Sequence, residues 1–527
     1  MRMVLIAALM LGLVTRAGAQ TPASIESIQT KPEQTNFEQT STYDDVTAFL
    51  NSLAQAAPKR IHVRAFGITN EKRALPLVVV GAASAAPEAV RRTGKIRVYI
   101  QANIHAGEVE GKESAQMLLR QLAAGKHDDW LEKMVLLVAP IYNADGNERL
   151  SLTSRGRQHG PIGGQGQRPN AQGLDLNRDH MKLDSPEARA VVKMMNEYDP
   201  HVSLDLHTTN GTRHAYHLTY SPPLNPATDP SIIDLLRKEW FPAITRNIRE
   251  KHGWDYYYYG NLEGGRGNEE RSWRSFDHRP RFNNNYIGLR NRFALLSEAY
   301  AYATFKDRII ATSRFVEETL NFIASHATRI RAIVERADRN SLIGSTLALR
   351  ARLAKSEDSV EILLGGVTQE KHPKDGHIME LRTNVKIAEK MPEYGIFEAT
   401  ETARVPMFYF VPPGLPEAAE RLKAHGVRAT PLTQATTMNI EEFQIESNTQ
   451  AAAAFQNHRE RTVTGKWVPA RRQLAAGSLM IPMNQPLARL AFYLLEPRSD
   501  DGLANRNFLD SALGPEAKIY PIVRSVR

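Results

Sequence analysis

The sequence predicts an α/β fold, a mixed and largely parallel sheet sandwiched by helices, followed by a smaller C-terminal domain that is mixed or β-rich. Three observations lead to this prediction. Apolar segments of strand length alternate with segments of helical periodicity through the first 340 residues. Several of the strand segments are nearly all apolar, as expected for strands buried on both faces. Shorter strand-like segments follow residue 340, which places a domain boundary there.

Six segments of the first part are predicted to be strands because they are rich in β-branched and other apolar residues. They are RIHVRAFG, LPLVVVGA, KIRVYIQANI, KMVLLVAP, HVSLDLH and RFALLSEAYAY. Helices are predicted where apolar residues recur at helical spacing between these strands. The predicted helices cover residues 42–56, 111–124, 185–198, 230–251 and 305–339, and the Gly-, Gln- and Pro-rich residues 156–173 form a loop.

The C-terminal part contains three further apolar segments, which we predict to be strands. They are SVEILLGGV, VPMFYFV and LARLAFYLL. A strand–helix–strand-like piece is expected at residues 406–432, and no internal repeat is visible.

The N-terminus has the pattern of a secretory signal peptide. Arg2 precedes an apolar run that ends near Val14, and Ala17 to Ala19 make a small-residue cleavage site. We expect residues 1–19 to be removed after Ala19, so that the protein is secreted or periplasmic. Residues 20–40 are a polar segment whose composition allows disorder. No later segment is apolar enough to predict stable membrane insertion.

Composition excludes several classes of site. The chain contains no cysteine, which rules out disulfides, thiolate metal ligands and a cysteine nucleophile. Any transition metal must therefore be held by His, Asp or Glu, and a secreted chain without disulfides fits a bacterial periplasm or exterior. The net charge of +9 is mild for 527 residues. Arginines gather in residues 266–292, but no nucleic-acid fold signature accompanies them, so we expect them to line a site for carboxylate substrates.

Candidate metal ligands follow the ends of two predicted strands. His105 and Glu108 stand three residues apart in NIHAGEVEG, directly after a strand, and His207 ends HVSLDLH. A catalytic metal site without cysteine needs three such ligands and one open position. A second H-x-x-E, His377 to Glu380, lies in a polar stretch without partner motifs, and we interpret it as surface.

Other polar residues complete a constellation around these ligands. Asp175, Asn177 and Arg178 stand together in GLDLNRDH, after the Gly-rich loop, and Glu298 interrupts an apolar strand. A buried glutamate is costly unless it is paired or catalytic. Taken singly, each residue has an ordinary structural explanation, but their joint occurrence in this order favours a catalytic site.

The order of these motifs resembles the zinc carboxypeptidases of the carboxypeptidase A type, the M14 metallopeptidases. The resemblance covers roughly residues 40–330 and rests on H-x-x-E, NADG, DLNRD, the strand-end histidine and the late glutamate. It implies a zinc peptidase catalytic domain over residues 41–340, with a carboxypeptidase-like sheet, and leaves residues 341–527 as one or more accessory domains of unassigned role.

The resemblance also implies a role for each matching residue. His105, Glu108 and His207 would bind one Zn²⁺ ion per chain, and Glu298 would be the general base. Asp175 would hold His105 in orientation. Asn177 and Arg178 would bind the terminal carboxylate of a peptide or peptide-like substrate.

Two roles are not fixed by the spacing. The family has an arginine that stabilises the oxyanion, for which Arg155 is the first choice and Arg157 the second. It also has a tyrosine that covers bound substrate, for which Tyr286 is the first choice and the cluster 256–259 the alternative. The chain departs from many family members at Gly107, where an arginine commonly precedes the glutamate ligand.

The implied activity is release of a C-terminal amino acid by a secreted metallocarboxypeptidase. Two alternatives remain open at this point. The same catalytic residues could serve an amidase or deacylase that acts on cell-wall peptides or acylated amino acids. A non-catalytic binding protein on a peptidase fold is disfavoured, because such proteins usually lose a ligand or the base, and all of these positions are intact here.

Overall fold

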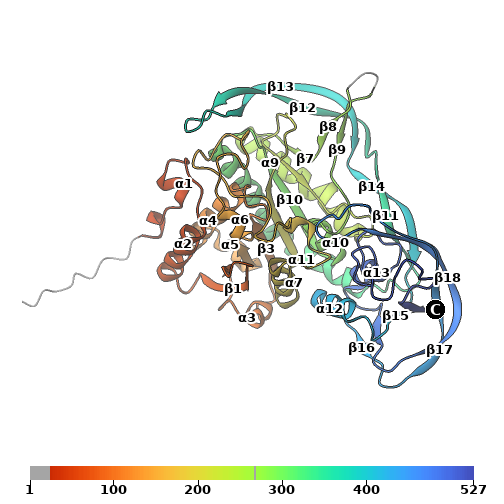
Figure 1. Cartoon of the computed structure of the whole chain (residues 1–527). Coiled ribbons are helices and arrows are strands. Elements are labelled where there is room, and N and C mark those ends of the chain that lie inside the picture. Colours follow the sequence, from red (N-terminus) through yellow and green to blue (C-terminus); the bar gives the residue numbers. More distant parts are fainter. Residues whose placement is uncertain (1–23, 266–268, 527) are drawn as a thin grey trace, which may run out of the picture.

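The computed structural model describes residues 24–265 and 269–526, so the predicted signal peptide lies outside the described residues. An eight-stranded sheet forms the centre of the first part, in the order β1-β2-β4-β3-β5-β10-β6-β7 (Figure 1). In sheet order its strands are β1 (His62–Ile68), β2 (Ala74–Val80), β4 (Met134–Ala139), β3 (Ile96–Ala102), β5 (Val202–Thr208), β10 (Phe293–Ala299), β6 (Leu218–Ser221) and β7 (Tyr256–Tyr258).

The four central strands, β4, β3, β5 and β10, run parallel, and antiparallel pairs occur at β1–β2, β2–β4 and β10–β6. The predicted mixed, largely parallel sheet is therefore confirmed. Parallel neighbours need long crossover connections, and helices supply them. The carboxyl ends of β3, β5 and β10 consequently lie at one edge of the sheet.

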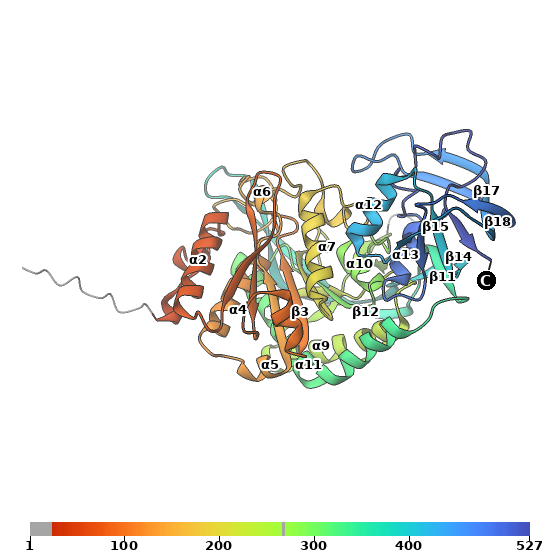
Figure 2. The ribbon, with the colours of Figure 1, turned by 90° about the horizontal axis from the view of Figure 1, so that it is seen from below.

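Helices cover both faces of this sheet, as its strand composition predicts. Along β4, Met134, Leu136 and Val138 pack in one core, whereas Val135 and Leu137 pack in the other. The first core includes residues of α2 (Tyr43–Ala56), α4 (Glu110–Ala123), α9 (Phe241–His252) and α11 (Phe305–Arg339), and the second includes residues of α7 (Pro186–Tyr198) and α10 (Asn283–Leu289). Figure 2 shows α2 and α4 on one side of the sheet and α7 on the other.

Residues 24–40 have defined contacts with the first part of the chain, which corrects the suggestion of disorder for this stretch, and residues 20–23 lie outside the described residues. Residues 24–40 contain the short helix α1 (Lys31–Gln34). Glu33 accepts two hydrogen bonds from Arg120 of α4, at 2.5 and 2.6 Å. Thr40 donates to the buried Glu113 at 2.7 Å. These charged and polar contacts hold a segment that has little apolar surface of its own.

The chain after α11 is rich in β-structure, as predicted. Two long antiparallel pairs come first, followed by a six-stranded sheet in the order β16-β19-β15-β20-β17-β18. The paired strands are β11 (Thr346–Ala354) with β14 (Ile396–Arg404) and β12 (Glu357–Lys371) with β13 (Ile378–Tyr394). The sheet consists of β16 (Thr430–Pro431), β19 (Leu479–Pro482), β15 (Phe408–Val411), β20 (Val523–Ser525), β17 (Thr436–Gln450) and β18 (Arg461–Leu474).

One predicted strand of this region is wrong. The segment LARLAFYLL forms a helix, α13 (Ala488–Leu495), in which every residue is buried. A short apolar run has no polar face, so its periodicity cannot distinguish a buried helix from a buried strand.

The region after residue 340 packs back on the first part rather than standing apart from it. α11 ends at Arg339, and β13 then pairs in parallel with β9 (Ser272–Arg274) of the first part. Residues of α13 and of β15 belong to the same hydrophobic core as α7. Among the described residues, no helix is long and apolar enough to cross a membrane.

An ion cluster at Asp184 joins the two parts. His458, from the connection between β17 and β18, donates to the Asp184 carboxylate at 2.8 Å, and Lys182 donates at 3.0 Å. Burial tends to raise the pKa of Asp184, but the hydrogen bond from His458 and the charge of Lys182 outweigh it and lower this pKa to about 2.

We predict that Asp184→Asn lowers the free energy of unfolding by about 1–2 kcal/mol near pH 6, allowing for partial solvent screening. The folded pKa lies below that of an unfolded aspartate, so the stabilisation is present above pH 4 and is lost as the pH falls through about 2. Urea unfolding of the wild type and of Asp184→Asn at pH 6, 5, 4 and 3 should therefore show a difference in the free energy of unfolding that becomes smaller below pH 4. The matched control is Asp234→Asn, at an exposed aspartate. A difference in the free energy of unfolding that does not depend on pH would contradict the lowered pKa of Asp184 as the source of the stabilisation.

Candidate active site

Two candidate ligands come from the turn after β3. Asn103 leaves the strand with a φ of 64°, and the backbone N–H of Glu108 then donates to the carbonyl of His105 at 2.9 Å. This tight turn brings side chains three residues apart to the same side. Both side chains are buried, with 4% and 3% exposure of His105 and Glu108.

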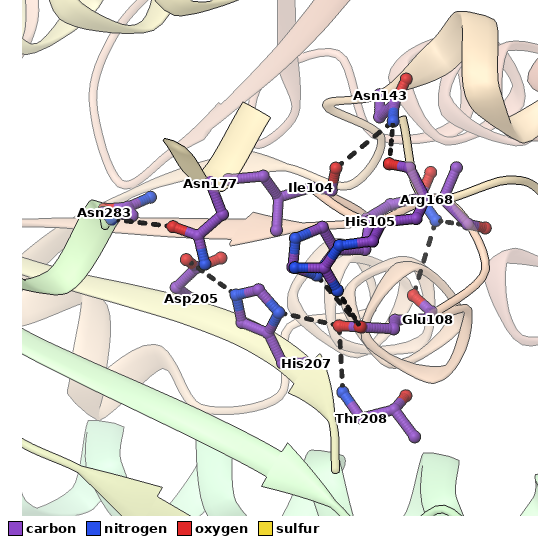
Figure 3. A network of polar contacts seen from close by, with 12 residues as sticks. Ile104, His105, Glu108, Asn143, Arg168, Asn177, Asp205, His207, Thr208 and Asn283 are labelled. Atoms are coloured by element: carbon purple, nitrogen blue, oxygen red, sulfur yellow. Dashed lines mark hydrogen bonds and ion pairs between the residues drawn. The ribbon is translucent and has the colours of Figure 1, made fainter. Parts of the chain in front are cut away.

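His207, near the end of β5, completes the group. Its Nδ1 lies 2.7 Å from one Glu108 oxygen, and the Nδ1 of His105 lies 3.0 Å from the other (Figure 3). One ligand atom from each of the three residues lies within 4.8 Å of the others. Two imidazole nitrogens and a carboxylate, buried and convergent, fit the donor set of a zinc site that keeps one position open.

Carboxylates hold the far side of both imidazole rings. The Nε2 of His105 lies 3.0 Å from Asp175 Oδ1, the partner that the sequence predicts. The Nε2 of His207 lies 3.0 Å from Asp205 Oδ2, at ion-pair distance although poorly aligned for a hydrogen bond. Such carboxylates leave each Nδ1 lone pair available to a metal. The sequence analysis did not select Asp205. It could have been found, because residues two apart on a strand lie on the same face of the sheet, and Asp205 is two residues before His207.

Glu298 of β10 lies beside His207, because the two residues are register partners on neighbouring parallel strands. Its side chain lines a cavity of about 230 Å³ that also exposes the three candidate ligands. Burial raises the pKa of Glu298 well above its usual value, the charge of His207 opposes this, and Glu108 adds to it. A carboxyl group with a raised pKa beside a metal site is suited to proton transfer.

The cavity ends at Asn177 and Arg178, which also line it. The Asn177 side-chain oxygen accepts from the backbone N–H of Asn283 at 2.8 Å, which leaves its NH₂ group available. The guanidinium of Arg178 lies 3.8 Å from the centre of the Phe282 ring. Stacking and hydrogen bonding therefore fix an amide and a guanidinium at the same end of the cavity.

One arginine that lines the cavity was not selected in the sequence analysis. Arg168 lines the cavity and donates to Asp175 Oδ2 with Nε and Nη2, at 3.0 and 2.8 Å. Arg155 instead lies on the ligand carboxylate, with its Nη2 2.6 Å from Glu108 Oε1. Arg157 is 74% exposed and lines a different cavity. Arg168 therefore replaces Arg155 and Arg157 as the candidate for oxyanion stabilisation. It lies in the Gly-rich loop, where spacing carries little information.

The first choice of capping tyrosine is wrong. Tyr286 is fully buried in α10 and its hydroxyl lies 2.8 Å from His425 Nδ1, away from the cavity. Tyr259, from the alternative cluster, does line the cavity. Its hydroxyl accepts hydrogen bonds from Asn210 at 3.0 Å and Asn261 at 3.1 Å.

The NADG motif has a structural role that links two loops of the site. Asn143 donates to the carbonyl of Ile104 at 3.4 Å and to that of Arg168 at 3.1 Å (Figure 3). Gly107 lies under the same loop, since a Cβ atom there would be 2.7 Å from the Gly166 carbonyl and 3.1 Å from Arg155 Cγ. The loop that carries Arg155 thus excludes a side chain at position 107.

The C-terminal region also reaches the site. Gln456, in the connection between β17 and β18, accepts a hydrogen bond from the backbone N–H of Asp175 at 2.8 Å. Asp175 is therefore held by a residue from the far end of the chain as well as by its own loop.

A second group of possible donors does not have the geometry of a metal site. His372, Asp375 and His377 also bring ligand atoms within 4.8 Å of one another. The two imidazole rings are stacked, with an interplanar angle of 13°, whereas the rings of His105 and His207 meet at 61°. Lone pairs in two parallel rings cannot converge on one ion. Contrary to its interpretation as surface, Glu380 of the same H-x-x-E is buried.

Three convergent donors, a carboxyl group beside them and a cavity that all of them line are the arrangement expected of a metal-dependent hydrolase. Residues 46–273 match the family model of zinc carboxypeptidases, Peptidase_M14. Residues 46–273, which include the three candidate metal ligands, are therefore similar to the zinc carboxypeptidase family, and this match and the carboxypeptidase relatives support a zinc metallopeptidase.

Two relatives named carboxypeptidase 2 can be aligned with most of the chain. Carboxypeptidase 2 of Trichophyton tonsurans is 25% identical over 501 residues, which are 91% of this chain and 86% of that protein. Carboxypeptidase 2 of Trichophyton rubrum is 25% identical over 504 residues, with the same coverage. The metallo-carboxypeptidase of Burkholderia cenocepacia is 19% identical, with 55% of this chain and 70% of that chain covered and a TM-score of 0.40, which is too low to support a conclusion.

We predict that the purified wild-type protein contains about one zinc ion per chain and that His207→Ala contains almost none. Asp205→Asn should retain the fold but bind zinc about 10–100-fold more weakly, because it loses the carboxylate behind His207. Metal analysis and competition with a chelator measure both effects. Asp234→Asn is the surface control, and zinc affinity unchanged in Asp205→Asn would contradict the orienting role of Asp205.

Proposed function

We propose that this protein is a secreted zinc carboxypeptidase that removes the C-terminal amino acid from peptides. The observation that carries this proposal is the placement of Asn177 and Arg178 at one end of the cavity that contains the metal donors and Glu298. An amide and a planar guanidinium at that end match the carboxylate of a free C-terminus.

The proposed reaction distributes roles among residues that line one cavity. Zinc bound by His105, Glu108 and His207 would acidify water in its open position and polarise a carbonyl oxygen. Glu298 would accept a proton from the attacking water and return it to the leaving amine.

Charge that develops on the scissile carbonyl also needs a partner in the protein. Arg168 lines the cavity and is held there by two hydrogen bonds to Asp175, so its guanidinium is positioned before substrate arrives. We assign it the stabilisation of the negative oxygen, because a preorganised donor costs no reorganisation during the reaction.

The walls at the carboxylate-binding end favour an apolar C-terminal side chain. Phe276, Phe282 and Leu296 line the cavity there. Asp277 lines it too, but Arg279 binds both of its oxygens and compensates its charge. A basic side chain would meet the like charges of Arg168 and Arg178, which also line the cavity.

The proposed location rests on the sequence alone. Residues 1–19 have the pattern of a cleaved signal peptide, and the absence of cysteine agrees with a periplasmic or extracellular bacterial protein. N-terminal sequencing of protein recovered from the exterior or periplasm of an expressing bacterium should begin at Gln20.

We predict that Glu298→Gln reduces kcat by about 10³-fold or more, because the amide cannot accept the proton. The variant should still bind zinc, since Glu298 is not among the three donors. Steady-state kinetics on a blocked dipeptide measure the effect, and the exposed Glu317→Gln serves as the matched control. A Glu298→Gln enzyme with near wild-type kcat would overturn the assigned base.

We predict that Arg178→Met reduces kcat/KM by about 10–100-fold for peptides with a free C-terminus, through loss of a charge-assisted contact. The same peptides with an amidated C-terminus provide the internal control. Wild type should strongly prefer the free acid, and the variant should lose most of that preference. Equal losses on acid and amide would mean that Arg178 does not bind the terminal carboxylate.

A substrate panel separates the proposed peptidase from an amidase or deacylase. Blocked dipeptides, acylated amino acids and cell-wall peptides would be compared by kcat/KM. Preference for blocked dipeptides supports the proposed function. A preference of more than tenfold for acylated amino acids or cell-wall peptides would assign the same catalytic residues to amide hydrolysis instead.

A further inference from the structure

A second cavity, of about 640 Å³, carries positive charge outside the catalytic residues. Its lining includes Arg157, Arg213 and Arg271, and no aspartate or glutamate among the described residues lines it. These guanidinium groups are 74%, 52% and 40% exposed. None of them is used in the reaction as proposed above.

The residues that line the two cavities adjoin along one short segment. Thr208 and Asn210 line the catalytic cavity, and residues 211–213 line the second. The hydroxyl of Tyr302, which also lines the second cavity, lies 3.5 Å from the carbonyl oxygen of Gly211. A chain that leaves the catalytic cavity along this segment therefore enters the second cavity directly.

The direction in which a peptide lies in the catalytic cavity decides which part of it follows that path. Asn177 and Thr208 lie on opposite sides of the His207–Glu108 pair (Figure 3). A peptide whose terminal carboxylate is at Asn177 has its scissile bond at the metal donors. The residues upstream of that bond then extend past Thr208 towards Arg213.

Buried or peripheral carboxylates fix the arginines without cancelling their charge. Arg213 donates to Glu380 with Nε and Nη2, at 3.3 and 3.1 Å, and Arg157 lies 3.8 Å from the same carboxylate. Glu380 is 1% exposed, so it lies beneath the two arginines rather than in the cavity. Arg271 donates to Glu389 with Nη1 alone, at 2.7 Å. Three arginines thus share two carboxylates and retain unpaired N–H donors.

The wall that carries these carboxylates comes from the region after residue 340. Leu364 and Gly365 of β12 line the cavity, and Glu380 and Glu389 belong to β13. Gly365 allows β12 to approach closely, because a Cβ atom there would lie 2.5 Å from the carbonyl oxygen of His214. The long β12–β13 pair therefore builds this cavity against the segment that follows the catalytic histidine.

We propose that the second cavity binds an acidic side chain of the peptide, upstream of the scissile bond, and that the enzyme therefore prefers acidic peptides. This inference rests on the proposed carboxypeptidase function. Arginine is suited to the task because its planar fork binds carboxylates with two hydrogen bonds.

The test uses the full-length enzyme and a series of N-terminally blocked peptides that all have the same C-terminal residue. A single glutamate is moved through the second to fifth positions upstream of the scissile bond, and glutamine and lysine are used at the same positions. At the position that reaches the cavity, kcat/KM should be about tenfold higher for glutamate than for glutamine and lower still for lysine. The glutamate preference should shrink at 1 M salt.

Two variants connect the preference to the cavity. Arg271→Gln and Arg157→Gln should each reduce the ratio of kcat/KM between glutamate and glutamine peptides, and the double variant should bring it close to 1. Neither arginine contacts the catalytic cavity, so hydrolysis of a blocked dipeptide should be unchanged. Arg246→Gln, an exposed arginine of α9, is the matched control and should keep the wild-type ratio.

The blocked dipeptide separates the two ways in which the experiment can fail. If the dipeptide is not hydrolysed, the proposed function itself fails. If it is hydrolysed but glutamate, glutamine and lysine peptides give equal kcat/KM at every position, the acidic-peptide site is wrong. A glutamate preference that survives the double variant would likewise exclude these arginines as its cause.

Discussion

The parallel pairing of β5 with β3 and with β10 is the constraint on which the site depends. It places the carboxyl ends of three strands side by side, so that the turn after β3, the end of β5 and the end of β10 meet. His207 and Glu298 are register partners, which sets the distance between a metal donor and the proposed base by backbone hydrogen bonding alone. A slip of one residue in this register would turn Glu298 to the opposite face.

Around this framework, Asp175 joins the loops that the sheet does not control. Its two oxygens bind His105 on one side and Arg168 on the other, and Oδ1 also accepts the backbone N–H of Asn177. Burial tends to raise the pKa of Asp175, but His105 and Arg168 lower it, so this carboxyl is ionised in the folded protein. The residues to which we assign metal binding, oxyanion stabilisation and carboxylate binding, His105, Arg168 and Asn177, are thus all oriented by one charge.

The three candidate metal ligands and the candidate base could be predicted from the sequence because they are attached to strands, and Asp175, Asn177 and Arg178 because they form one short motif. His105, Glu108, His207 and Glu298 follow or end apolar segments whose burial is visible in the sequence, and the sheet edge brings them together. Arg168 and Tyr259 come from long connections, where side-chain direction depends on contacts such as Asn143 with Ile104. For the same reason Tyr286 was misplaced, because its short helix is buried against the C-terminal region.

One element after residue 340 was predicted wrongly for a related reason, although the β-rich character of the region was predicted correctly. The segment at Ala488–Leu495 is buried all round by partners distant in sequence, so no polar face shows its helical period. The prediction of two separate parts also gave no sign that one hydrophobic core runs from α7 into α13.

Gln456 connects the C-terminal region directly to the candidate active site. Its side chain ends at the backbone of Asp175, 281 residues away in sequence, from the connection between two long strands of the C-terminal sheet. Removing the last third of the chain would therefore expose an apolar face of the central sheet and also leave the loop that orients the metal donors without one of its supports. The ribosome must therefore have synthesised the chain beyond the β17–β18 connection before the peptidase can be fully assembled, which delays the appearance of a complete proteolytic centre during translation.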